Sequence, residues 1–218
     1  MIMAITAILV DDHSIVRQGI KSVISQEPDI EIVAEASNGN EAIELVREKS
    51  PDVVIMDITL PLLNGLDASR QILKQNKNIK IVILSMHENR VFIEKALNYG
   101  VKGYVLKESA VDEIRQAIRE VYAGRYFLSA KISSFVIQDY VANKKKPIQL
   151  RSISVLTSRE REVLQLIAEG LSSKEIAQRL NLALKTILVH RNNIMRKLDI
   201  HNQTQLVRFA LKEGISSL

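Results

Sequence analysis

The run Val53-Val54-Ile55-Met56-Asp57 is a short apolar segment that ends in a carboxylate, and it has the composition of a buried strand. Strands of a parallel sheet read as near-continuous β-branched runs of about four to eight residues, because helices cover both faces of the sheet. Similar runs occur on either side of it in the first half of the chain. The predicted strands are Ile5–Val10, Ile30–Ala36, Val53–Asp57, Lys80–Ser85 and Gly103–Leu106.

Segments with apolar residues at helical spacing separate these strands. Ser14–Ser25, for example, places Ile15, Ile20 and Val23 on one side of a helix. The other helices predicted here are Gly39–Lys49, Leu66–Gln75, Asn89–Tyr99 and Ala110–Ala123. Strands that alternate with helices in this way predict an α/β fold, a five-stranded, doubly wound parallel sheet. Ligands of such sheets bind at the carboxyl ends of the strands.

Length and composition limit the class of protein. The 218 residues suffice for two small domains with separate cores. The absence of cysteine excludes disulfides and thiolate metal sites. The N-terminus lacks the pattern of a signal peptide, and no apolar run approaches the length of a membrane span. We therefore expect a soluble, cytoplasmic protein that does not enter a membrane.

Charge is distributed unevenly along the chain. Residues 1–124 contain 14 Lys and Arg against 18 Asp and Glu, whereas residues 151–218 contain 11 against 6. An acidic first half and a basic second half indicate two different tasks, and the second half suits a polyanionic partner. Imbalances of this size also occur in proteins that have no such partner.

The sequence changes character after residue 124. Residues 127–142 have the spacing of an isolated amphipathic helix, and Asn143–Pro147 contains three consecutive lysines before a proline. Like charges repel and proline ends a helix, so this segment is predicted to be a linker. The predicted domains are residues 1–124 and residues 151–218, joined by a linker over residues 125–150 that includes the helix at 127–142.

The second domain is predicted to be all-α. Thr157-Ser158-Arg159-Glu160 has a hydroxyl followed three residues later by Glu, which is the pattern of a capping box at a helix N-terminus. Gly170 ends that helix. Three further helices are predicted over Lys174–Leu180, Lys185–Leu198 and Thr204–Gly214, which makes this a four-helix domain.

Chemically matched side chains lie at the ends of several predicted strands. Asp11 and Asp12 follow the first strand, Asp57 ends the third, Ser85 ends the fourth, and Lys107 follows the fifth. Carboxylate clusters suit a hard divalent cation such as Mg²⁺. One carboxylate could then attack a phosphoryl group while the cation and the lysine neutralise charge. Each residue alone could be an ordinary cap, turn or surface group, but the matched positions together favour a phosphoryl-transfer site.

Three motifs resemble those of response-regulator receiver domains, and the resemblance covers about residues 4–124. They are Leu9-Val10-Asp11-Asp12-His13, Asp57-Ile58-Thr59-Leu60-Pro61-Leu62-Leu63-Asn64-Gly65 and Gly103-Tyr104-Val105-Leu106-Lys107. The resemblance implies a flavodoxin-like fold with Asp57 as the phosphoacceptor. It also implies that Asp12, Asp57 and the backbone carbonyl of Thr59 bind Mg²⁺, and that Asp11 does so through a water molecule.

The same resemblance assigns the remaining polar residues of the pocket. Lys107 would stabilise the phosphoryl group, and Ser85 and Tyr104 would form a switch pair in which the aromatic ring follows the hydroxyl. As an alternative, Tyr104 is a half-buried strand residue with no switching role. Many receivers have proline directly after the lysine, whereas this chain has Glu108, so the backbone there need not follow the family's.

The second half resembles the LuxR-type helix-turn-helix, through its segments at residues 156–170, 172–180 and 185–198. Joined to a receiver, it resembles the NarL/FixJ family, with Lys174–Leu180 as scaffold helix and Lys185–Leu198 as recognition helix. Arg and Lys neutralise phosphates, and Asn and Arg read base edges. The expected DNA contacts are Lys174, Lys185, Thr186, Leu188, Val189, Arg191, Asn192, Arg196 and Lys197. Relatives often carry Lys at position 188. The alternative is a solvated basic helix face.

The resemblance implies a phosphorylation-controlled transcriptional regulator of a two-component system. A sensor histidine kinase would phosphorylate Asp57, and the activated homodimer would bind double-stranded DNA. The chain would not be an enzyme beyond its own phosphorylation from a donor and its autodephosphorylation.

Three alternatives differ in class. The first is a constitutive DNA-binding regulator with an unswitched receiver. A haloacid-dehalogenase-like phosphohydrolase is disfavoured, because Asp11-Asp12 and Thr59 depart from its Asp-x-Asp arrangement. An autoinducer-binding regulator is disfavoured, because the first half does not read as an apolar ligand chamber.

Overall fold

The computed structural model describes residues 4–86, 88–142 and 155–216. The chain divides into two compact units, Met1–Lys144 and Lys145–Leu218. The predicted linker segment at residues 143–150 lies outside the described residues. Within the described ranges, no helix combines the length and the apolar character that crossing a bilayer requires.

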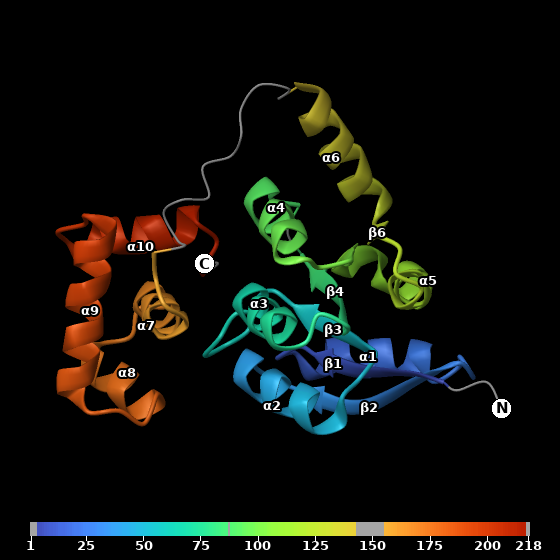
Figure 1. Cartoon of the computed structure of the whole chain (residues 1–218), viewed down its shortest axis with the longest axis horizontal. Helices are drawn as coiled ribbons and strands as arrows, with labels where there is room; N and C mark the ends of the chain where they lie inside the picture. Colours follow the sequence, from blue (N-terminus) through green and yellow to red (C-terminus); the bar gives the residue numbers. More distant parts are fainter. Residues whose placement is uncertain (1–3, 87, 143–154, 217–218) are drawn as a thin grey trace. The chain divides into compact units, whose positions relative to one another are not determined.

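A parallel sheet forms the centre of the first unit (Figure 1). Its strands run in the order β2-β1-β3-β4-β5-β6. They are β1 (Ile5–Val10), β2 (Ile30–Ala36), β3 (Val53–Asp57), β4 (Lys80–Ser85), β5 (Gly103–Leu106) and β6 (Phe127–Leu128). The first five are confirmed with their predicted bounds. Because the order reverses at β1, the carboxyl ends of β1 and β3 lie side by side, which is where such sheets bind ligands.

The prediction of a five-stranded sheet was wrong, because β6 adds a sixth strand. β6 pairs in parallel with Gly103 and Tyr104 of β5. The helix predicted over residues 127–142 therefore begins later, as α6 (Ala130–Ala142). A two-residue strand is too short to have a periodicity of its own. It forms because the backbone N–H of Phe127 reaches the carbonyl of Lys102 at 2.9 Å, a tertiary contact that local sequence does not encode.

Helices cover both faces of the sheet, which explains the continuous apolar strands. Side chains alternate along β1, so that Ile8 and Val10 face one core and Ala7 and Leu9 face the other. Helices α2, α3, α4 and α6 cover the first core, and α1 and α5 cover the second. Their bounds are α1 (Ser14–Ile24), α2 (Gly39–Lys49), α3 (Gly65–Gln75), α4 (Arg90–Tyr99) and α5 (Ala110–Tyr122). A short 3-10 turn, Lys107–Ser109, precedes α5.

Over residues 155–216, the second unit folds into four helices around a separate apolar core. They are α7 (Ser158–Ala168), α8 (Ser173–Arg179), α9 (Leu184–Leu198) and α10 (Gln203–Lys212), close to the predicted bounds. The predicted capping box of Thr157 and Glu160 begins α7, and Ser172 and Glu175 form a second one at α8. The core residues include Leu164, Ile167, Ile176, Ile187, Ile194 and Leu206.

Candidate functional sites

Carboxylates from two strands meet at the carboxyl edge of the sheet. Asp11 directly follows β1 and is fully buried, and Asp57 ends β3 and is 2% exposed. Asp12 and His13 continue from Asp11 at the exposed rim. Each of these four residues offers one possible ligand atom, and the four atoms lie within 4.8 Å of one another. The sheet therefore assembles the predicted acidic pocket, with His13 at its edge.

Lys107 places its ammonium between the two buried carboxylates. Its Nζ lies 2.8 Å from Oδ2 of Asp57 and 2.7 Å from Oδ2 of Asp11. Burial disfavours the charged lysine, but attraction to Asp57 and Asp11 outweighs that penalty and raises the pKa of Lys107. The lysine is therefore a fixed cation at the point where β1, β3 and β5 end.

The surroundings of Asp57 still disfavour its ionised form, despite the nearby Lys107 cation. Burial raises the pKa of Asp57 to about 6, although the charge of Lys107 acts in the opposite direction. The carboxylate of Asp11 raises the pKa further, while the backbone N–H of Thr59 donates to Asp57 and lowers it. A further positive charge in this pocket would therefore stabilise the ionised form of Asp57.

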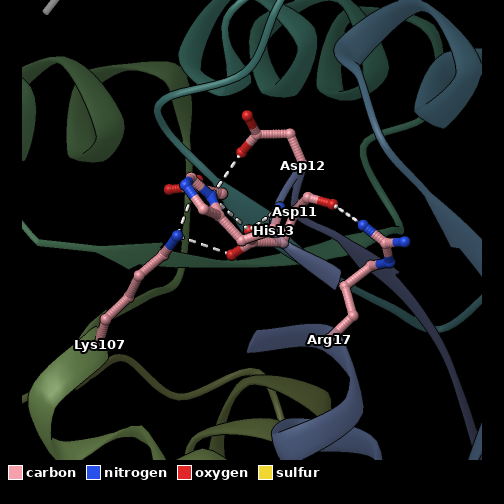
Figure 2. A network of polar contacts seen from close by, with 6 residues as sticks. Asp11, Asp12, His13, Arg17 and Lys107 are labelled. Atoms are coloured by element: carbon pink, nitrogen blue, oxygen red, sulfur yellow. Dashed lines mark hydrogen bonds and ion pairs between the residues drawn. The ribbon is translucent and has the colours of Figure 1, made fainter. Parts of the chain in front are cut away.

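Arg17 is a residue of this site that sequence reasoning missed. From α1, its Nη1 donates to the backbone carbonyl of Asp11 at 2.6 Å. Figure 2 shows Arg17 and Lys107 approaching Asp11 from opposite sides. The sequence signal for this contact was the position of Arg17, one helical turn after His13, because the first turn of α1 returns the side chain to Asp11.

Gly65 is a second site residue that sequence reasoning missed. Its role depends on the close approach of its backbone to that of Asp57. A Cβ built on Gly65 would lie 1.7 Å from the backbone carbonyl oxygen of Asp57. The Gly65 N–H donates to the carbonyl of Ile58 at 2.9 Å, which folds the loop back onto the end of β3. Only glycine permits this approach, so Gly65 fixes the loop that follows the acceptor carboxylate.

Ser85 and Tyr104 lie next to the pocket. Ser85 ends β4 at 1% exposed, and Tyr104 on β5 is fully buried. The two side chains are hydrogen-bonded, and burial raises the pKa of Tyr104 to about 12. Tyr104 is therefore a core residue rather than the half-buried strand tyrosine of the alternative interpretation.

Helix α9 carries an exposed stripe opposite its buried side. Ile187 and Ile194 are buried in the core of the second unit. On the other side, at helical spacing, lie five exposed predicted contacts, Lys185, Leu188, Val189, Asn192 and Arg196. Leu188 and Val189 are 46% and 50% exposed, so their methyl groups are accessible to a partner. The stripe offers cations, an amide and methyl groups, the set that reads a major groove.

The other predicted contacts lie outside this stripe. Lys174 is exposed on α8, and Thr186 is half-buried near the start of α9. Arg191 donates to Oγ of Ser173 and to Oε1 of Gln203, at 3.1 Å each. It therefore holds α9 to the starts of α8 and α10.

Lys197 is itself exposed, but its ammonium pairs with a buried carboxylate. Its Nζ lies 2.6 Å from Oε2 of Glu160, whose side chain is only 4% exposed. Glu160 also accepts from the backbone N–H of Thr157, at 2.7 Å, in the capping box of α7. Lys197 thus neutralises a buried carboxylate, so we expect it to stabilise this domain rather than to make the DNA contact predicted from the sequence.

Comparison with known proteins identifies both halves. Residues 7–119 match the response regulator receiver domain, and residues 154–210 match bacterial regulatory proteins of the luxR family. The chain is 33% identical to the transcriptional regulatory protein DegU of Brevibacillus brevis, over 96% of this chain and 94% of the relative. It is 35% identical to the oxygen regulatory protein NreC of Staphylococcus haemolyticus (strain JCSC1435), over 95% and 97%.

A solved structure extends the likeness across both units. RcsB from Salmonella enterica serovar Typhimurium, bound to promoter P1flhDC in the presence of phosphomimetic BeF₃⁻, matches with a TM-score of 0.61 and 26% identity. The match covers 97% of this chain and 99% of that one. The two matched domains, in this order and over nearly the whole length of the relatives, place the chain in the NarL/FixJ family of DNA-binding two-component response regulators.

Proposed function

We propose that Asp57 accepts a phosphoryl group from a sensor histidine kinase and that this controls the DNA binding of the second domain. A carboxylate oxygen of Asp57 attacks phosphorus and forms an acyl phosphate, while the bond between phosphorus and the donor histidine nitrogen breaks. Hydrolysis of the acyl phosphate returns the free carboxylate and inorganic phosphate. The arrangement of Asp57, Lys107 and Asp11 is the observation that supports this proposal.

The donor set of the pocket fits Mg²⁺. The ligand atoms of Asp11, Asp12 and Asp57 are carboxylate oxygens within the 4.8 Å cluster, and hard divalent cations prefer such ligands. We assign direct binding to Asp12, Asp57 and the backbone carbonyl of Thr59, and binding through water to Asp11. When bound, the cation supplies neutralising charge beside the transferring group.

The chain's own residues provide the rest of the transfer chemistry. Lys107 already holds a positive charge 2.8 Å from Asp57, where the phosphoryl oxygens would develop negative charge. Ser85 supplies a hydroxyl at the adjacent strand end, and Tyr104 is hydrogen-bonded to it. We propose that Ser85 moves toward the phosphoryl group and that Tyr104 follows, which gives the receiver two discrete states.

The exposed stripe of α9 is the proposed reading surface. Arg196 and Lys185 would contact phosphates, Asn192 a base edge, and Leu188 and Val189 thymine methyl groups. The DNA backbone beside these bases would be contacted by Lys174, Thr186 and Arg191. Because RcsB is bound to a promoter in its solved structure, we propose that this chain also binds operator DNA, as a homodimer on two half-sites.

The test is intact mass after incubation with Mg²⁺ and a small phosphoryl donor, with Asp57→Asn in parallel. We expect the unmodified chain to gain one phosphoryl group and the variant to gain none. Affinity for DNA, measured on the same samples, should rise only where the group is gained. No gain in a folded sample that binds Mg²⁺ would favour the constitutive DNA-binding regulator instead.

A further inference from the structure

Ser129 connects the start of α6 to the end of β5. It is 2% exposed, and its Oγ accepts from the backbone N–H of Leu106 at 3.1 Å. The same hydroxyl donates to the carboxylate of Glu113 on α5. The backbone N–H of Ser129 donates to the carbonyl of Tyr104 at 2.9 Å. Ser129 is thus bonded to β5 at the switch tyrosine and at the residue that precedes Lys107.

Lys131 holds the other side of Lys107. Its Nζ lies 2.5 Å from Oε1 of Glu108, the residue that follows Lys107. A weaker contact of 3.7 Å joins Lys131 to Glu88. Because these side chains are more than half exposed, water screens this pair, and Ser129 is the stronger of the two connections. Residues 129 and 131 therefore hold both neighbours of the lysine that contacts Asp57.

Helix α6 begins directly at these contacts and packs on the core. The first hydrogen bond of the helix runs from the Ser133 N–H to the Ser129 carbonyl at 2.9 Å. Ile132 is fully buried in the core that also contains Tyr104, and Phe135 packs against the same core. A displacement of the Leu106 backbone would therefore act on a helix that is packed against the core. In the sequence, α6 is the last described element before the DNA-binding domain.

We infer that Ser129 is a positioning residue for Lys107 and that its contacts couple α6 to phosphorylation of Asp57. The inference rests on the proposed function, since it needs Asp57 to accept the group. Lys107 spans Asp57 and Asp11, and a phosphoryl group on Asp57 gives its ammonium new partners. The backbone around Lys107 adjusts, and Ser129 passes that adjustment to α6. Coupling is reciprocal, so loosening α6 must in turn alter the behaviour of Asp57.

The kinetic test compares Ser129→Ala with Ser134→Ala in the full chain. Ser134 is a matched control, because it lies on α6, is exposed, and donates within the helix to the carbonyl of Ala130 at 3.0 Å. With Mg²⁺ and a small phosphoryl donor, Ser129→Ala should slow phosphorylation by about two- to tenfold, the range expected from loss of the hydrogen bond that holds the Leu106 N–H beside Lys107. Ser134→Ala should match the unmodified chain. A role limited to stability would lower the melting temperature of Ser129→Ala and leave its rate unchanged, which would overturn the inference.

Hydrogen exchange tests the coupling in the opposite direction. The amides of residues 130–138 should change their exchange when the unmodified chain is phosphorylated, and Ser129→Ala should reduce that difference. Lys131→Met, at a side chain 62% exposed, keeps the test available if Ser129→Ala does not fold, and should give a smaller change of the same sign. Normal phosphorylation with unchanged exchange in α6 would overturn the inference alone. No phosphorylation of the unmodified chain would overturn the proposed function and the inference with it.

Discussion

Lys197→Met and Arg196→Met should have different consequences, although the two side chains are neighbours near the end of α9. Arg196 is exposed on the stripe opposite the core, and it donates to the nearby Asn193 Oδ1 at 3.0 Å. Lys197 is 2.6 Å from the buried carboxylate of Glu160. The first substitution removes a proposed phosphate contact, and the second leaves a buried carboxylate without its cation.

The magnitudes follow from these environments. An unmatched buried hydrogen-bonding group costs about 1–3 kcal/mol. The Lys197 side chain is 32% exposed, and Glu160 keeps its bond to the Thr157 N–H, so we take the lower part, about 1–2 kcal/mol. For a domain of this size, each kcal/mol lowers the melting temperature by about 4–8 °C. Arg196→Met should leave that temperature unchanged.

The two variants should also separate in the salt dependence of DNA binding. Non-specific binding suffices for this assay, because each neutralised phosphate contributes about 0.9 to the slope of log K against log salt. Anisotropy of a labelled random-sequence duplex is measured at several salt concentrations. Arg196→Met should reduce the slope by about 1 for each bound copy. Lys197→Met should leave the slope unchanged.

The reasoning would be refuted if Lys197→Met reduced the salt slope as much as Arg196→Met and had the same melting temperature as the unmodified chain. That result would mean that Lys197 leaves Glu160 to contact DNA. The melting transitions of the two domains are followed separately, because a two-domain chain need not unfold in one step.

Three further predictions concern single residues. Gly65→Ala should lower the melting temperature of the receiver and abolish phosphorylation of Asp57, because the new Cβ would overlap a backbone oxygen. Gly19→Ala is the control, since Gly19 lies in open space on a helix and the substitution should stabilise the fold by about 1 kcal/mol. Equal effects of the two variants in thermal melts would contradict this prediction. Lys107→Met should slow phosphorylation by about 10²-fold in the mass assay, and a rate within twofold of normal would exclude its electrostatic role. The pKa of Glu160 is lowered because hydrogen bonds from Lys197 and Thr157 outweigh burial, so its stabilisation is present above pH 4.5 and is lost as the pH falls through the folded pKa. Denaturant titrations of Glu160→Gln between pH 3 and 7, the range around the carboxylate pKa of about 4.3, should show a shallower acid loss.

The five long strands could be predicted from sequence because their burial on both faces leaves a continuous apolar run. Val53–Asp57 is buried at every position, so the apolar run alone predicts where this strand begins and ends. The convergence of Asp11, Asp57 and Lys107 followed from parallel topology, which puts all carboxyl ends at one edge. These features depend on local pattern and on one general rule of sheet architecture.

The remaining features depend on tertiary contacts that have no local pattern. β6 exists through its pairing with β5, and the sequence of Phe127–Leu128 is equally compatible with the start of a helix. Lys197 reads as one more basic residue of α9 until its distance to Glu160 is known. Arg17 differs from both, because its position one turn into α1 was a local signal for its contact with Asp11.

The sixth strand has a practical consequence for dividing the chain. β6 covers the outer edge of β5, where the carbonyls of Lys102 and Tyr104 accept from the N–H groups of Phe127 and Ser129. A receiver cut at residue 124 would leave both acceptors to water and the edge of β5 open. Open strand edges recruit other chains into intermolecular sheets. A fragment that ends at residue 142 retains the closed edge, and aggregation of the shorter fragment would be an artefact of where it was cut.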